Sequence, residues 1–220
     1  VVEPLALDSL PALGEDVEAV SVCLLFSFRD PSHERAVAEE LRRRMPRARV
    51  VASHEVAPEV REYERASTTA IDAYLGPAVA RYLEALGAAS VGAGLPEPLV
   101  MRSSGGLATL AEAVAHPAVA LVSGPAGGVV GAARVAGVEN ALTLDMGGTS
   151  TDVCRFAGTL ERRDAAKVAG VKLRSPMLDV ETVAAGGGSI LAFDGMRARA
   201  GPASAGADPG PACYGRGGPA

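Results

Sequence analysis

The chain has 220 residues, with 21 basic and 26 acidic side chains and a formal net charge of -5. This length can bury the core of one domain or of two small lobes. The acidic balance, with lysine only at Lys167 and Lys172, argues against a nucleic acid or an anionic membrane as the main partner. Most of the 26 glycines follow Gly105. We therefore expect scaffold in the first half, and backbone that comes close to a ligand in the second.

The cysteines predict a reducing, cytoplasmic setting. Cys23, Cys154 and Cys213 are odd in number, far apart and not in a C-x-x-C pair, so we expect structural thiols. The three histidines, His33, His54 and His116, do not have the spacing of a metal site.

The ends of the sequence predict a segment of a larger protein, because there is no initial Met and the chain ends on GGPA. The first ten residues include acids and no basic region, which is not the pattern of a signal peptide. The uncharged stretch 117–133 is interrupted by SGPAGG and is shorter than the ~20 apolar residues of a membrane span.

The first elements predict a βαβ unit with a parallel sheet. The apolar run 20–28 predicts a buried strand. Ser32, after Pro31, is the expected N-cap of a helix that stops at Pro46, and residues 47–53 predict the second strand.

A long amphipathic pattern follows over residues 59–86, which predicts one or two helices with a kink at Pro77 and an end at Gly87. A loop over 92–98 comes next. The remaining expected elements are a strand over 99–103, a helix over 107–114, a strand over 119–122, a helix over 128–136, and strands over 141–145 and 151–156.

The segment DMGGTSTD, residues 145–152, predicts a phosphate site. A strand delivers a carboxylate at its end, the glycines let amides face outward, and hydroxyls follow, so phosphate oxygens and Mg²⁺ both find ligands. It is not a Walker loop, because no Gly-Lys-Ser/Thr occurs and a strand follows the turn. The alternative is a plain β-hairpin with a Gly-Gly turn.

Two further glycine clusters favour the same chemistry. SGPAGG, residues 123–128, is expected between a strand and a helix N-terminus, where amides favour an anion. TVAAGGGSI, residues 182–190, could place three glycines against a ligand. The alternative for each cluster is a tight loop that serves packing alone. The tail 201–215 would be a linker on composition alone, and Cys213 has no histidine after it to act as its base.

These motifs resemble one known family, that of ATP-dependent hydantoinase A and 5-oxoprolinase. SGPAGGVVGA, DMGGTSTDV, TVAAGGGSI and SAGADPGPACYGRGG stand in the family's order and spacing. The resemblance implies an α/β fold of ribonuclease H-like lobes, as in actin, sugar kinases and heat-shock chaperones, here incomplete. It assigns residues 1–65 to the end of the first lobe and residues 66–220 to the hydantoinase A/oxoprolinase domain.

The resemblance also implies the site. It makes Asp145 and Asp152 catalytic, with Asp145 as the metal ligand, and ATP and Mg²⁺ as cofactors. The residues that it places at the nucleotide are Gly147, Gly148, Thr149, Ser150, Thr151, Gly186, Gly187, Gly188 and Ser189. Two departures from the family's pattern are the lack of a first D-x-G-G-T loop in residues 1–120, and Ala203 in place of the usual acid.

The implied reaction opens 5-oxo-L-proline to L-glutamate with ATP hydrolysis, a step of glutathione metabolism, because the run 161–195 is more similar to the 5-oxoprolinase branch. The isolated segment is expected to be inactive. A B-type subunit or domain is the expected partner, beside a small cyclic amide, and a homo-oligomer is left open. The alternatives are an N-methylhydantoinase, an acetone or acetophenone carboxylase subunit, and a non-enzymatic nucleotide-binding assembly module.

Overall fold

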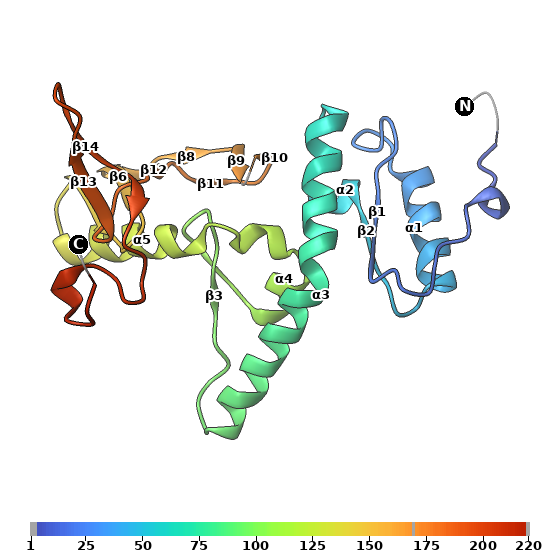
Figure 1. The fold of residues 1–220 in the computed structure, drawn as a ribbon. Coiled ribbons are helices and arrows are strands. Elements are labelled where there is room, and N and C mark those ends of the chain that lie inside the picture. Colours follow the sequence, from blue (N-terminus) through green and yellow to red (C-terminus); the bar gives the residue numbers. More distant parts are fainter. Residues whose placement is uncertain (1–3, 169, 219–220) are drawn as a thin grey trace. The chain divides into compact units, whose positions relative to one another are not determined.

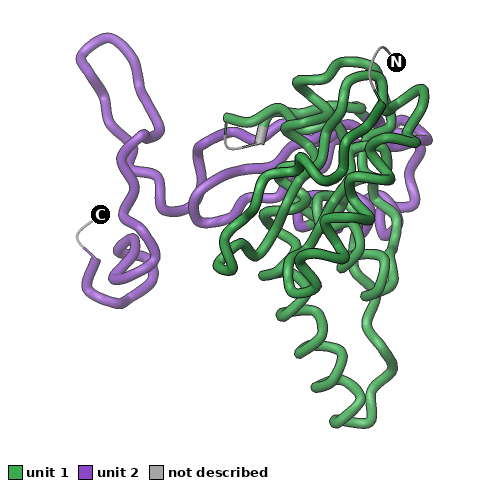
Figure 2. Tube along the Cα trace, turned by 90° about the vertical axis from the view of Figure 1, so that its right-hand side faces the viewer, with its two compact units in different colours: residues 1–123, 163–177 green, residues 124–162, 178–220 purple. Residues whose placement is uncertain are grey.

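The computed structural model describes residues 4–168 and 170–218. It divides into two compact units, one from the described residues of 1–123 and 163–177, the other from those of 124–162 and 178–218 (Figure 2). The two compact units are defined by contacts within this chain. The predicted boundary at residue 65 is instead a boundary between lobes of the family fold, and it stays a prediction.

The first unit contains the predicted parallel βαβ motif. Strand β1 (Ala19–Val22) pairs in parallel with β2 (Arg49–Ala52), and helix α1 (Ser32–Arg44) connects them. Their shared core holds the side chains of Val22, Val37, Ala38, Leu41, Val50 and Ala52. The mixed α/β class of the prediction is therefore confirmed for this unit.

The predicted strand over 20–28 is too long. Strand β1 ends at Val22, and the chain then turns, with Phe26 at φ 61° and the amides of Arg29 and Asp30 donating to Phe26 O. Leu25 and Phe26 are 73% and 64% exposed. An apolar run alone does not reveal such a turn, because its cause is the backbone conformation at one residue.

The predicted cap of α1 is also wrong. Ser32 is the first residue of the helix, and Pro31 occupies the N-cap position. The Ser32 amide donates instead to Asp30 Oδ1 at 3.0 Å, and this hydrogen bond lowers the pKa of Asp30. The acid two residues upstream therefore satisfies an amide of the first turn.

Helix α3 (Glu62–Gly92) is longer than predicted and runs through both Pro77 and Gly87. Its axis bends partway along (Figure 1), as an interior proline leads one to expect. A Cβ at Gly87 would lie 2.8 Å from Leu110 Cδ1. Gly87 thus makes room for helix α4 (Leu110–Ala115) and does not end α3.

Short elements complete the first unit. The predicted strand over 119–122 is wrong, because residues 117–120 form a 3-10 helix and a turn follows. The other elements are the 3-10 helix η1 (Leu7–Ser9), helix α2 (Ser53–Val56), and strands β3 (Val100–Met101), β4 (Leu107–Ala108), β9 (Ala166–Val168) and β10 (Val171–Leu173). Strands β8 (Arg162–Arg163) and β11 (Met177–Leu178) pair with each other, and the unit boundary falls within both.

The second unit contains an antiparallel sheet in the order β12-β6-β5, with β7 paired to β6. The hairpin of β5 (Asn140–Met146) and β6 (Thr151–Ala157) confirms the two predicted strands. The remaining elements are helix α5 (Ser123–Ala136), strands β7 (Thr159–Leu160), β12 (Glu181–Val183), β13 (Ser189–Phe193) and β14 (Ala198–Ser204), and the 3-10 helix η3 (Ala212–Tyr214).

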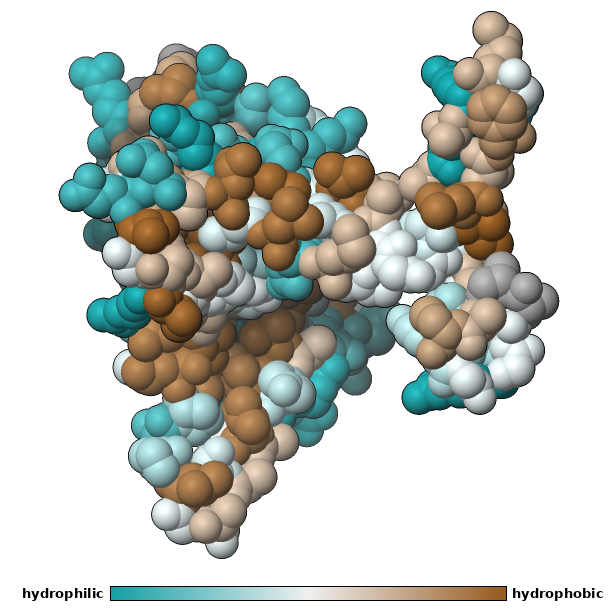
Figure 3. Space-filling model, turned by 90° about the vertical axis from the view of Figure 1, so that its left-hand side faces the viewer, coloured by the Kyte–Doolittle hydropathy of each residue, from teal (hydrophilic) through white to brown (hydrophobic). Residues whose placement is uncertain are grey.

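Apolar side chains are exposed on this unit. Leu191, Phe193 and Met196, in the β13–β14 hairpin, are 79%, 70% and 93% exposed. The space-filling view shows exposed apolar side chains interspersed with polar ones on the face drawn (Figure 3). None of the described helices combines the length and apolar character that a bilayer crossing needs.

A buried carboxylate ties together the loops of the first unit. Glu34 is fully buried and accepts hydrogen bonds from the Leu24 and His54 amides, both at 2.8 Å, and from Ser53 Oγ at 2.7 Å. Arg65, also buried, donates to Ser53 Oγ and to Leu24 O. Burial by itself raises the pKa of Glu34, but these hydrogen bonds together outweigh it and hold the pKa below its usual 4.5.

We expect Glu34→Gln to lower the free energy of unfolding at pH 7 by about 1–3 kcal/mol, because an amide nitrogen replaces an oxygen that accepts buried hydrogen bonds. A carboxyl whose pKa is depressed by folding contributes stability above its unfolded pKa, and this is lost as the pH falls through the folded value. The difference from wild type should therefore shrink below pH 4.5. Urea unfolding of both proteins at pH 7 and below pH 4.5 measures this difference in the free energy of unfolding.

Glu39→Gln, on the exposed face of the same helix, is the control and should change stability by less than about 0.5 kcal/mol. A loss for Glu34→Gln that is the same at pH 7 and at low pH would contradict the role of the ionised carboxylate.

Candidate functional site

The turn between β5 and β6 contains backbone amides that have no acceptor within the described chain. The Gly147 amide closes the turn by donating to Ser150 O at 2.9 Å. Among the described residues, no acceptor takes a hydrogen bond from the amides of Gly148, Thr149 or Ser150. Gly148 and Thr149 are exposed. Successive free amides with an adjacent hydroxyl form the kind of concavity that binds an anion.

The glycines 186–188 lie directly against this turn. Gly187 and Gly188 donate their amides to Gly147 O and Gly148 O, at 2.9 and 2.7 Å. A Cβ at Gly186 would lie 2.6 Å from Gly147 O and 2.8 Å from Ser150 N. Only a residue without a side chain permits this approach, so glycine is required at position 186 by the contact between two backbones.

Two predicted site residues fix the glycine loop. Thr151, which is buried, donates its hydroxyl to Ala185 O at 2.6 Å. Ser189 Oγ accepts the Gly186 amide at 2.9 Å. These hydroxyls are therefore engaged within the protein, whereas Gly148, Thr149 and Ser150 keep their amides free.

The tail forms a third layer on the two loops. Ala205 donates its amide to Gly188 O at 2.8 Å, and a Cβ at Gly188 would lie 3.2 Å from Ser204 Oγ. Farther along, the Tyr214 hydroxyl lies near Gly148, 3.7 Å from where a Cβ of that glycine would be. The composition of a linker therefore belongs to a segment that packs on the site.

Asp145 and Asp152 face each other across the hairpin. They are directly opposite in the β5–β6 register, which puts both carboxylates on the same face of the sheet. Thr182 Oγ1 donates to Asp152 Oδ1 at 2.6 Å. Asp145 Oδ2 approaches helix α5, 3.3 Å from where a Cβ of Gly128 would be.

All the predicted site residues lie in the second unit. The glycine motif at residues 123–128 has a different structure from the one predicted. The predicted turn over 123–128 is wrong, because these residues form the first turns of α5. Gly128 serves to let Asp145 come close, a role that the spacing of glycines in the sequence does not indicate. Tyr214 was missed as well, because its neighbourhood to Gly148 depends on the path of the tail.

Other candidate groups lie apart from this site. The three cysteines are thiols outside any disulfide, and Cys213 is exposed. His54 Nδ1 lies 2.6 Å from Glu34 Oε2, in the buried network of the first unit. In the described part of the chain, no cluster of three or more His, Cys, Asp or Glu side chains has the geometry of a metal site.

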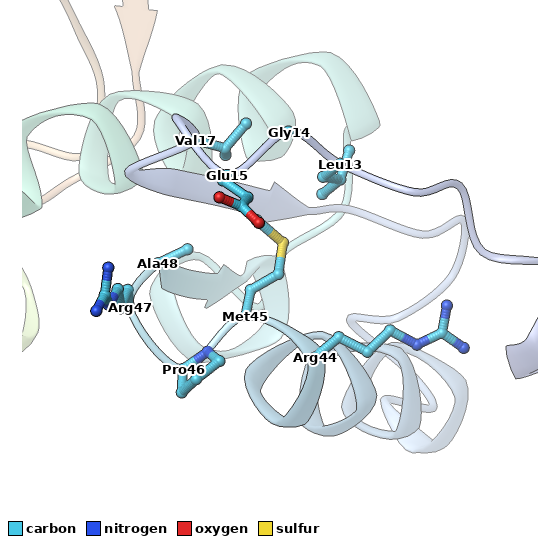
Figure 4. Close-up of a pocket in the computed structure, with 9 residues that line it drawn as sticks. All are labelled: Leu13, Gly14, Glu15, Val17, Arg44, Met45, Pro46, Arg47 and Ala48. Atoms are coloured by element: carbon cyan, nitrogen blue, oxygen red, sulfur yellow. The ribbon is translucent and has the colours of Figure 1, made fainter.

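The first unit has a cavity of about 310 Å³ between the end of α1 and the segment before β1 (Figure 4). Glu15 and Met45 point toward one another there, beside Arg44 and Arg47. None of the predicted phosphate-site residues lines it.

Comparison with known proteins agrees with the motifs. The family model for hydantoinase/oxoprolinase matches residues 65–220. The chain belongs to the hydantoinase/oxoprolinase family. All the loops of the candidate site fall within the matched range.

Members of the hydantoinase/oxoprolinase family with different names are about equally similar. The caprolactamase subunit alpha of Pseudomonas jessenii is 41% identical over 212 residues, 93% of this chain and 30% of the relative. The 5-oxoprolinase 1 of Arabidopsis thaliana is 42% identical over 211 residues, 94% of this chain and 16% of the relative. The chain thus spans less than a third of the length of either.

Two solved structures share the fold. The ATP-dependent caprolactamase of Pseudomonas jessenii has a TM-score of 0.75 at 37% identity, over 93% of this chain and 30% of that one. Nucleotide-free acetone carboxylase has a TM-score of 0.68 at 31% identity, over 87% and 28%. The chain therefore has a mixed α/β fold of hydantoinase type.

We expect Gly186→Ala to destabilise the second unit by about 1–3 kcal/mol, because the new methyl group meets backbone atoms that cannot rotate away. Gly187→Ala is the matched control, since its Cβ would have only an ordinary contact, 3.8 Å from Gly147 O. Urea unfolding of both variants measures the difference. Equal stability of the two would show that the loops do not touch as described.

Proposed function

We propose that this chain is the phosphate-binding part of an ATP-dependent cyclic amide hydrolase. The observation that carries the proposal is the turn 147–150, whose carbonyls at Gly147 and Gly148 accept hydrogen bonds from the glycine loop while the amides of Gly148 and Thr149 have no acceptor among the described residues. Membership of the hydantoinase/oxoprolinase family supports it, as does similarity to an ATP-dependent caprolactamase and to an acetone carboxylase described as ATP-dependent.

The residues present fit a nucleotide phosphate. The amides of Gly148 and Thr149, with the Thr149 hydroxyl, offer three donors to phosphate oxygens, whereas the Ser150 nitrogen lies against Gly186. Gly147, Gly186, Gly187, Gly188 and Ser189 would act by shaping the turn, and Thr151 by holding the glycine loop. The predicted nucleotide contacts would thus divide into direct ligands and supporting residues.

The two aspartates fit Mg²⁺. Like charges directly opposite on a sheet repel, and a divalent cation between them offsets that repulsion. Carboxylate oxygens are the ligands that Mg²⁺ prefers, commonly together with substrate phosphates. Asp145 would bind the metal, while Asp152, with one oxygen already paired to Thr182, would orient the ion or a water through the other. Bound Mg²⁺ would neutralise charge on the phosphates.

The chemistry explains why an amide hydrolase would need such a turn. An unstrained amide resists water, and phosphorylation of its oxygen makes its carbon electrophilic. The contribution of the protein to phosphoryl transfer is mainly positioning and charge stabilisation. Rigid amides supply both, because they do not have to reorganise when charge moves during the reaction.

For the substrate, we propose 5-oxo-L-proline, opened to L-glutamate, in the cytoplasm and with a B-type subunit or domain as partner. The identity to 5-oxoprolinase 1 supports it, and the similar identity to caprolactamase subunit alpha keeps another lactam as the second candidate. For the fold, we propose ribonuclease H-like ATPase lobes, with residues 1–65 ending the first. The parallel βαβ unit and the β5–β6 hairpin support this architecture.

In the full-length protein, we expect Asp145→Asn to lower ATP hydrolysis at least about tenfold and to weaken its dependence on Mg²⁺, because one metal-binding charge is lost. Phosphate release at a series of Mg²⁺ concentrations measures this. Asp164→Asn, an exposed aspartate of the other unit, is the control.

Assays with 5-oxoproline, caprolactam, hydantoin and acetone in parallel identify the substrate by which compound stimulates phosphate release. If Asp145→Asn hydrolyses ATP at the wild-type rate, the turn 147–150 is not the phosphate site. If the wild type hydrolyses ATP but only acetone stimulates it, the amide substrate is wrong and the phosphate site stands.

A further inference from the structure

We propose that the hydroxyl of Tyr214 is a ligand of the nucleotide's phosphate chain. This inference rests on the proposed function and adds a side-chain donor to the turn 147–150. Tyr214 lies 64 or more residues away from that turn in the sequence, on the 3-10 helix η3.

The position of the hydroxyl points to this role. It lies at Gly148, the glycine whose amide is free, at 3.7 Å from where a Cβ of that residue would be. No partner for the hydroxyl exists among the residues that the structure describes, and the side chain is 46% exposed. A free phenol beside free amides adds one more donor to the same concavity.

The ring of Tyr214 packs against Gly210, and this packing position is its seat. A Cβ at Gly210 would lie 2.5 Å from Tyr214 Cδ2 and 3.0 Å from Cε2, so the ring packs on the bare backbone of that glycine. Gly210 has φ 76°, a conformation that also favours glycine. The Tyr214 amide donates to Pro211 O at 2.9 Å, which fixes the start of the side chain. A ring held in this way loses little freedom when its hydroxyl binds a ligand.

The seat also indicates which part of a nucleotide the residue meets. The Cδ2–Cε2 edge of the ring lies against Gly210, and the part of the ring that reaches the turn is the end with the hydroxyl. A phenol is neutral at pH 7 and donates to an anion without bringing charge of its own. The geometry therefore favours a hydrogen bond to phosphate over stacking on the base.

The test compares Tyr214→Phe with wild type in the full-length protein. Phenylalanine keeps the ring on Gly210 and removes only the donor. A hydrogen bond to a charged group corresponds to about ten- to hundredfold in affinity, so ATP and pyrophosphate should bind about ten- to hundredfold more weakly. Adenosine, which has no phosphate, should bind as to wild type. Isothermal titration, direct or by competition, measures all three affinities.

Tyr82→Phe is the matched control, because Tyr82 is 67% exposed on α3 in the other unit. It should leave all three affinities unchanged. Circular dichroism and the unfolding midpoint of Tyr214→Phe should equal those of wild type.

The outcomes separate the inference from the proposed function. If Tyr214→Phe binds ATP as wild type does while Asp145→Asn has lost Mg²⁺-dependent ATP hydrolysis, the tyrosine role is wrong and the phosphate site stands. If adenosine and ATP weaken equally, the residue acts on the shape of the site and the inference is overturned. If the wild type binds neither ATP nor pyrophosphate, the proposed function fails and the inference with it.

Discussion

The second unit depends on one contact between two stretches of bare backbone, Gly186–Gly188 and the turn 147–150. The glycine amides occupy the carbonyl oxygens of Gly147 and Gly148, which fixes how the peptide planes of the turn lie. The C=O and N–H of a trans peptide group point in opposite directions. Because the carbonyls of Gly147 and Gly148 point toward the glycine loop, the amides of Gly148 and Thr149 point away from it. Under the proposed function, a phosphate-binding surface thus arises from a packing requirement, without any basic side chain in the turn.

The first unit stabilises its loops by the opposite means. There, a buried carboxylate and a buried guanidinium, Glu34 and Arg65, satisfy amides and carbonyls at the ends of β1 and β2. Side chains can hydrogen-bond to loop backbone only where there is room for them. When such polar side chains are buried, each of their polar atoms needs a hydrogen-bond partner. In the first unit, side chains hold the loops together, whereas in the second unit backbone groups hydrogen-bond to each other directly. The clustering of glycine after Gly105 reflects this difference.

Local patterns predicted the elements whose causes are local. The βαβ unit and the β5–β6 hairpin follow from apolar runs and a Gly-Gly turn, and both are present. Two local features, the turn at Phe26 and the hydrogen bond from the Ser32 amide to Asp30, were missed. Other errors occurred where a distant residue decides: Gly87 makes room for Leu110, and Gly128 for Asp145. A glycine required by a neighbour and a glycine that ends a helix are the same letter in the sequence. The position of the Tyr214 hydroxyl beside Gly148 was missed for the same reason.

If the loops of this chain bind phosphate, as proposed, that role would explain why its relatives have different names at nearly equal identity. A caprolactamase subunit is 41% and a 5-oxoprolinase 42% identical over almost the same stretch. Amides and aspartates that hold a phosphate need not change when the carbonyl compound changes. Under the proposed function, the choice of substrate therefore depends on side chains outside the turn 147–150 and its two supporting layers. Identity over this stretch then reflects a shared use of ATP rather than a shared substrate.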